Sequence, residues 1–120
     1  MIDLEKIIND AFEDRENINV NTAGDIRNAV DETLNKLDSG NLRVCEKINN
    51  EWQVNQWIKK AILLSFRLND NEIIKASHAT WFDKVESKTA NWTKDDHLKA
   101  GFRYVPCLLY TSPSPRDYRE

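Results

Sequence analysis

The sequence is poor in the residues that build disulfide frameworks, metal sites and phosphate-binding loops. It contains two cysteines, two histidines and three widely separated glycines in 120 residues. Cys45 and Cys107 are too far apart in sequence for a disulfide framework or a zinc site, and scattered glycines exclude a glycine-rich phosphate loop. His78 and His97 have no cysteine or carboxylate at ligand spacing, so we predict surface histidines and no metal site.

Long hydrophobic runs and a concentrated basic patch are also missing. The longest apolar run, Ala61–Leu64, is far shorter than the roughly 20 residues that a membrane-spanning helix needs. The start of the chain, MIDLEKIIND, is acidic and amphipathic and does not resemble a secretion signal. With a net charge of −3, the chain is also a poor candidate for nucleic acid. We expect a cytoplasmic protein with neither a membrane nor a nucleic-acid partner.

What remains is the composition of one soluble globular domain, with 40% hydrophobic and 31% charged residues. The charges are unevenly distributed along it. Residues 1–40 hold ten acidic and four basic residues, whereas residues 41–106 hold eleven basic and eight acidic ones. Any anion-binding surface is therefore expected in the second part.

The longest apolar-rich segment lies between Glu51 and Asn71 and predicts a buried central helix. Its apolar residues cover an arc of about 200° at about 100° per residue, which requires packing on several sides. Leu63 is the one apolar residue on the opposite arc, which otherwise forms a basic stripe. This stripe either contacts a ligand or only extends its side chains into water, and the sequence leaves both open. The apolar arc is Trp57, Ile58, Ala61, Ile62, Leu64, Ser65, Phe66 and Leu68, and the basic stripe is Gln56, Lys59, Lys60 and Arg67.

Two amphipathic helices are predicted before this segment. Apolar residues recur at helical spacing near the N-terminus and predict a helix to about Arg15. Glu16–Asn21 has the composition of a polar connector, and Thr22–Asp25 has the pattern of a capping box. A second stripe ends at Ser39–Gly40, a helix stop. The two stripes, which predict a helical hairpin, are Leu4, Ile7, Ile8, Ala11 and Phe12, and Ile26, Ala29, Val30, Thr33, Leu34 and Leu37.

Short strands are expected on either side of the central helix. From Leu42 to Val54, apolar and polar residues alternate about Asn49–Asn50, whose side chains tolerate the left-handed backbone conformation. This pattern predicts a β-hairpin. After a turn at Asn69–Asn71, Ile73–Ile74 predicts another extended piece, and residues 75–92 are expected to form an ordered loop packed on the core.

The C-terminal part contains a second capping-box pattern, Thr93–Asp96, followed by a helix stop at Gly101. This predicts a short helix over 94–100 and makes its two acids capping residues rather than a catalytic pair. Residues 102–105 alternate like a strand, which Pro106 would end. The predicted fold is thus mainly α (α+β), a small domain of about four helices with a short β-hairpin.

One residue is a candidate for substrate binding. Arg103 lies between two aromatic residues of the predicted strand, where a planar guanidinium can bind a carboxylate through two parallel hydrogen bonds. No nucleophile elbow or catalytic triad is present in the sequence. We therefore predict substrate binding at Arg103 and no catalytic residue in this chain.

The last fourteen residues, CLLYTSPSPRDYRE, differ from the rest in composition. Two prolines separated by serine and the absence of any period predict a flexible tail. The string LLYTSPSPRD also resembles a translated cloning or sequencing adapter. We therefore divide the chain into one helical domain, residues 1–106, and a non-native or disordered tail, residues 107–120.

Several strings, in their order and spacing, resemble one enzyme family. They are AFEDRENI, the tryptophan-rich LDSGNLRVCEKINNEWQVNQWIKKAILLSFRLNDNEII, WFDKV and GFRYVP. Together they are similar to the N-terminal domain of the tetrahydrodipicolinate N-succinyltransferases, the succinyl-CoA-dependent acyltransferases of the diaminopimelate route to lysine. The similarity covers residues 1 to about 106. It departs from the family at Glu86, where proline is usual, and from Cys107 onward.

The resemblance implies a fold and a role for this domain. In the family, the helical N-terminal domain leads into a left-handed parallel β-helix that assembles as a homotrimer, and none of that β-helix is present here. Arg103, in the string GFRYVP, is implied to bind the dicarboxylate substrate. Succinyl-CoA is the implied co-substrate, while the carboxylates that move the proton and most of the coenzyme A site are implied to lie outside this chain. We therefore expect a fragment that binds no cofactor and is inactive alone.

An alternative from another class is a free-standing helical module that binds a protein partner through exposed tryptophans such as Trp81 and Trp92. Hexapeptide repeats encoded after the Pro106 codon would favour the enzyme, and a natural stop codon would favour the module. The sequence does not decide whether Lys59, Lys60 or Arg67 contacts a ligand.

Overall fold

A computed structural model of the chain describes residues 3–105, which belong to two compact units divided between Val85 and Glu86. The prediction of a mainly α (α+β) fold with four helices is confirmed for this range, and there is one β-hairpin more than expected. None of these helices is both long and apolar enough to cross a membrane. The first unit contains α1 (Leu4–Glu13), the 3₁₀ helix η1 (Arg15–Asn17), α2 (Asp25–Asp38), β1 (Cys45–Ile48), β2 (Glu51–Val54), α3 (Gln56–Leu68), β3 (Glu72–Lys75) and β4 (Thr80–Asp83), and the second contains α4 (Lys94–Ala100).

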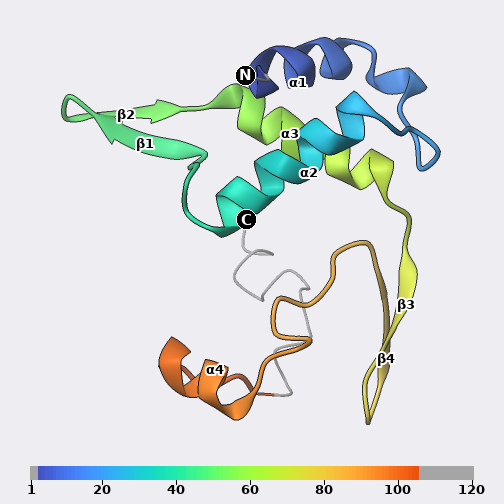
Figure 1. The fold of residues 1–120 in the computed structure, drawn as a ribbon, viewed down its shortest axis with the longest axis vertical. Coiled ribbons are helices and arrows are strands. Elements are labelled where there is room, and N and C mark those ends of the chain that lie inside the picture. Colours follow the sequence, from blue (N-terminus) through green and yellow to red (C-terminus); the bar gives the residue numbers. More distant parts are fainter. Residues whose placement is uncertain (1–2, 106–120) are drawn as a thin grey trace, which may run out of the picture. The chain divides into compact units, whose positions relative to one another are not determined.

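The helices α1, α2 and α3 form the core of the first unit, and each packs against the other two (Figure 1). The predicted stripes of α1 and α2 face this core, which confirms the helical hairpin. Burying a leucine or isoleucine side chain stabilises a fold by roughly 1.5–3 kcal/mol, so this cluster dominates the stability of the unit. The buried side chains are Leu4, Ile8, Ala11, Ile18, Ala29, Val30, Thr33, Ile58, Ala61, Leu64, Ser65 and Leu68.

The central helix α3 is confirmed, but its buried face is narrower than predicted. Its buried positions follow one stripe from Ile58 to Leu68. Phe66, predicted to be part of the apolar arc, is 44% exposed, and Leu63 is 52% exposed. The physical reason is that two helices, α1 and α2, cover only one side of α3. The outer side carries apolar residues that neither α1 nor α2 covers.

The capping box predicted at Thr22–Asp25 does not form. The hydroxyl of Thr22 accepts a hydrogen bond from the backbone N–H of Asn19 and closes a turn there. Gly24 is the N-cap of α2, with a φ of 82° and no side-chain cap. Because a capping box at Thr22 would need residue 24 in the helical region, the positive φ of Gly24 rules it out.

The connector between α1 and α2 was predicted to be polar, but one of its residues is part of the core. Ile18 is only 5% exposed and belongs to the core. Beside it, the Arg27 guanidinium donates to the backbone carbonyl oxygens of Thr22 (2.7 Å), Val20 (2.9 Å) and Leu68 (2.9 Å). Arg27 therefore ties the connector to the C-terminal end of α3.

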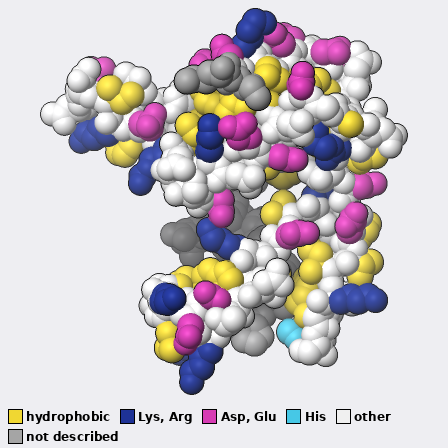
Figure 2. Space-filling model, viewed as in Figure 1, with side chains coloured by type: hydrophobic (Ala, Val, Ile, Leu, Met, Phe, Trp, Pro, Cys, Tyr) yellow, Lys and Arg dark blue, Asp and Glu magenta, His cyan; other side chains and the backbone are white. Residues whose placement is uncertain are grey.

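The predicted hairpin β1–β2 is confirmed and extends away from the three helices (Figure 1). Asn49 and Asn50 both adopt positive φ, at 50° and 68°, which suits the two-residue turn that asparagine favours. Lys47 pairs with Trp52, whose side chain is 73% exposed. Figure 2 shows hydrophobic side chains at the surface of this hairpin.

The loop predicted over residues 75–92 is wrong for residues 80–83, which form the strand β4. The extended piece at Ile73–Ile74 is confirmed as β3, but it pairs with β4 in a second antiparallel hairpin. Neither hairpin packs extensively on α1, α2 or α3, and Ile73 and Phe82 are 59% and 67% exposed. In β4, the adjacent aromatic residues Trp81 and Phe82 point to opposite faces of the hairpin. The sequence of β4 therefore lacks the alternation of apolar and polar residues by which a strand is predicted.

Candidate functional site

The candidate residue Arg103 follows α4, whose two ends form as predicted. At the start, the Thr93 N–H donates to the Asp96 carboxylate (2.7 Å), and the Asp96 N–H donates to the Thr93 hydroxyl (3.4 Å). At the end, Gly101 adopts φ 73° and donates its N–H to the His97 carbonyl (3.2 Å). These contacts confirm the capping box and the helix stop.

The capping box also sets the electrostatics at the start of α4. Hydrogen bonds from the backbone and then the hydroxyl of Thr93 lower the pKa of Asp96 below its ordinary value of 3.8. Hydrogen bonds to the charged form favour ionisation, so this carboxylate stays negative at neutral pH. Asp96 is thus a capping residue, as predicted.

Arg103 itself lies in irregular backbone rather than in the predicted strand. Phe102 is a bend, and residues 103–105 pair with no strand among the described residues. Alternation alone does not make a strand, because an extended segment needs a partner for its backbone hydrogen bonds. The Arg103 side chain is exposed and makes no hydrogen bond or ion pair with residues 3–105. Its guanidinium is therefore available to a carboxylate.

The basic stripe of α3 is largely used inside the first unit. The Lys60 ammonium donates to the Asn9 side-chain oxygen (3.1 Å) and lies 5.4 Å from the centre of the Phe12 ring. The Arg67 guanidinium donates to the Arg15 carbonyl (3.1 Å). These two residues fasten α3 to the α1–η1 segment, a role that neither alternative for the stripe predicted. Lys59 is exposed.

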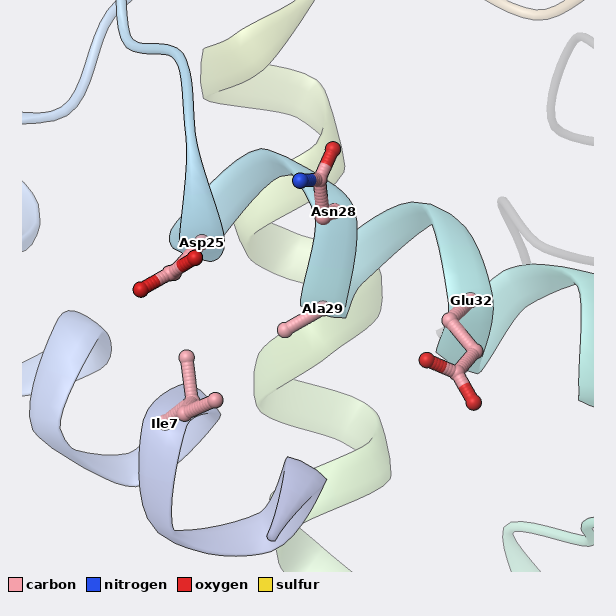
Figure 3. A pocket seen from close by; sticks show the side chains of 5 residues that line it. All are labelled: Ile7, Asp25, Asn28, Ala29 and Glu32. Atoms are coloured by element: carbon pink, nitrogen blue, oxygen red, sulfur yellow. The ribbon is translucent and has the colours of Figure 1, made fainter. Parts of the chain in front are cut away.

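A pocket that the sequence did not predict lies between α1 and α2, with a volume of about 160 Å³ (Figure 3). Ile7 and Ala29 form its apolar part, and Asp25, Asn28 and Glu32 line it from α2. Glu32 also pairs with Lys36 at 3.0 Å. Ile7 and Ala29 fitted the core stripes, so no sequence signal marked them as pocket residues. The pocket shares no residue with the predicted binding site.

The remaining candidates give no further site in the described chain. The His78 ring lies 6.0 Å from that of Trp81, and Cys45 is exposed, while Cys107 is outside the described residues. Between residues 3 and 105, no group of three or more His, Cys, Asp or Glu side chains is arranged to hold a metal ion. Trp81 and Trp92 are half-buried rather than exposed, so that premise of the interaction-module alternative is wrong.

The three-helix part of the chain matches a known family. Residues 3–68 match the family model for the N-terminal domain of tetrahydrodipicolinate N-succinyltransferase. This range spans α1, α2 and α3 and ends with the last residue of α3. The family resemblance inferred from the sequence is therefore confirmed.

Several curated relatives, each named 2,3,4,5-tetrahydropyridine-2,6-dicarboxylate N-succinyltransferase, are similar over most of the chain. The protein of Pelagibacter ubique is 50% identical over 109 residues, which are 88% of this chain and 40% of that protein. Those of Agrobacterium fabrum and Methylorubrum extorquens are 53% and 55% identical, over 86% and 87% of this chain. The chain spans about 40% of the length of these relatives. It belongs to the family of tetrahydrodipicolinate N-succinyltransferase N-terminal domains.

Proposed function

We propose that this chain is the N-terminal part of an enzyme that transfers the succinyl group of succinyl-CoA to tetrahydrodipicolinate, in lysine biosynthesis through diaminopimelate. The observation that carries the proposal is the family match over the three-helix core, together with relatives of about 50% identity that bear this enzyme name. The proposed domain is residues 1–106, and residues 107–120, which lie outside the described residues, stay a predicted non-native or disordered tail. The homotrimer and the cytoplasmic location also stay predictions.

The substrate is a 2,3,4,5-tetrahydropyridine, a cyclic imine whose nitrogen carries no hydrogen, so a water molecule first adds across its C=N bond and makes the nitrogen an N–H amine. This nitrogen then attacks the thioester carbonyl carbon. A C–N bond forms, the C–S bond breaks, and coenzyme A leaves as the thiol while the nitrogen gives up a proton. Most of the catalytic effect then comes from holding the two substrates together and removing that proton. We propose no residue of this chain for the proton transfer. Its contribution is to bind and orient the dicarboxylate.

Arg103 is the proposed contact to a substrate carboxylate. Its exposed guanidinium has no partner among residues 3–105, and its planar fork suits two parallel hydrogen bonds to a carboxylate. Lysine would keep the charge but not the fork. The proposal therefore distinguishes a bidentate contact from simple charge attraction.

The test uses a chimera that joins residues 1–105 to the remaining part of the Agrobacterium fabrum relative. Arg103→Ala is expected to raise KM for tetrahydrodipicolinate about 10- to 100-fold, because hydrogen bonds to charged groups contribute about 1.5–3 kcal/mol. Arg103→Lys should recover only part of this loss. KM for succinyl-CoA should stay unchanged.

Arg43→Ala is the matched control, since Arg43 is an exposed arginine outside the proposed site. It should leave both KM values unchanged. A folded chimera without succinyltransferase activity would contradict the proposed enzyme. An active chimera in which Arg103→Ala leaves KM unchanged would contradict the role of Arg103 alone.

A further inference from the structure

Three aromatic rings meet across the ends of α4, and we name Trp92, His97 and Phe102 the aromatic cluster. The Trp92 ring centre lies 5.0 Å from that of His97 with the planes at 70°, and 6.0 Å from that of Phe102. Trp92 directly precedes the N-cap residue Thr93, and Phe102 directly follows the C-cap residue Gly101. The indole of Trp92 thus connects the residues that flank the two ends of the helix.

The short helix needs such a contact. It has seven residues and no buried side chain, and isolated helices of this length are marginal in water. Edge-to-face and tilted aromatic contacts at these separations are attractive. The aromatic cluster therefore supplements the capping box and Gly101 in keeping α4 folded.

The same contact restrains the backbone next to the proposed binding residue. Phe102 is bonded directly to Arg103, and residues 103–105 have no regular secondary structure of their own. When the ring of Phe102 rests on Trp92, the φ and ψ angles available at the 102–103 junction are reduced. A ligand-binding group held in place before binding loses less conformational entropy when it binds.

We propose that Trp92 and Phe102 are positioning residues that orient Arg103 for a substrate carboxylate. This inference rests on the proposed function, because it assumes that Arg103 binds the dicarboxylate. It adds two residues that touch no substrate and act only through the backbone of Arg103. The predicted signature is weaker dicarboxylate binding without a change at the succinyl-CoA site.

The structural half of the proposal can be tested on the 120-residue chain itself by ¹⁵N NMR relaxation. The Arg103 amide is expected to have an order parameter near that of rigid backbone, about 0.85. Phe102→Leu should lower it to below about 0.6, and Phe102→Tyr, which keeps the ring, should restore it. Leu98→Ala is the control, since Leu98 is on α4 but 67% exposed. An equal order parameter in the parent and Phe102→Leu chains would overturn the inference.

The functional half uses the chimera described above. Phe102→Leu and Trp92→Leu are expected to raise KM for tetrahydrodipicolinate about three- to tenfold, with kcat and KM for succinyl-CoA unchanged. In the Arg103→Ala background the same substitutions should have no further effect, because both act through one residue. Phe102→Tyr should restore the parent KM. General destabilisation would instead alter both substrates and add to the Arg103→Ala effect, and would overturn the proposal.

The two hypotheses fail in distinguishable ways. If Arg103→Ala leaves KM for the dicarboxylate unchanged, the role of Arg103 fails and the positioning proposal fails with it. If Arg103→Ala raises this KM but Phe102→Leu does not, only the positioning proposal fails. Circular dichroism of each variant shows whether the chain is folded before its kinetics are interpreted.

Discussion

Residues 3–68 and residues 69–105 bury their side chains to very different extents. Every buried side chain of the described chain lies between Leu4 and Leu68, and no residue from 69 to 105 is buried. The first region is also the one that the family model matches. Its helices cover one another, whereas β3, β4 and α4 keep their form through backbone pairing, caps and ring contacts. The core region thus supports itself, and the second region carries the proposed binding residue on locally held structure.

This difference links the stability of the fold to the first region and the proposed substrate binding to the second. Substitutions in residues 3–68 are expected to change the free energy of unfolding, and those around α4 to change mainly the order of a short segment. Substitutions in the two regions and an acid titration test this division.

Leu64→Ala should give the largest loss of stability. Leu64 is fully buried in α3, and truncating a buried leucine costs about 2–5 kcal/mol through lost burial and the cavity left behind. Urea denaturation followed by circular dichroism measures the loss. Ile73→Ala is the control in the second region, because Ile73 is 59% exposed and its truncation should cost less than about 0.5 kcal/mol. Equal losses in the two variants would refute the division.

Arg27→Met should have an intermediate effect. The methionine keeps an apolar stem but removes the donors to three backbone carbonyls, one of them that of Leu68 at the end of α3. Leaving part-buried acceptors unpaired is expected to cost about 1–3 kcal/mol in the same denaturation experiment. Arg43→Met is the control, as Arg43 is exposed. A loss of stability no greater than that of Arg43→Met would show that the hydrogen bonds from Arg27 do not stabilise the connector.

Acid should have the smallest and most local effect. Because the pKa of Asp96 is lowered in folded α4, its carboxylate stabilises the helix above its ordinary pKa of 3.8. This contribution is lost as the pH falls through the lowered pKa. The amide chemical shifts of α4 during an acid titration measure it. Asp96→Asn should abolish the corresponding transition, and an unchanged titration of these amides in that variant would exclude the capping carboxylate as its cause.

Helical periodicity and local turn chemistry allowed most of the fold to be predicted. The stripes of α1, α2 and α3, the Asn49–Asn50 turn and the capping box at Thr93 each depend on residues close in sequence. The errors concern features that depend on distant partners or on one backbone angle. Phe66 is exposed because α1 and α2 pack on the other side of α3, and the Thr22 capping box fails because of the φ angle at Gly24.

The candidate site was predicted less completely from the sequence than the fold was. Arg103 was chosen for its chemistry and its motif, but its setting was predicted as a strand that does not form. The aromatic cluster was not predicted, since Trp92 and Phe102 are ten residues apart and meet only because α4 lies between them. The pocket at Ile7 and Ala29 depends on how two helices approach each other, which periodicity does not specify.

Gly101 sets the direction of the chain where it leaves α4. Apart from Gly101 and its neighbours in the chain, no described residue has an atom within 4 Å of the position that a Cβ would take there. What disfavours a larger residue is the φ of 73°, at which a methyl group would clash with its own peptide unit. The direction in which the chain leaves α4 toward Arg103 therefore depends on the absence of a Cβ atom at Gly101, and not on steric contacts with other described residues.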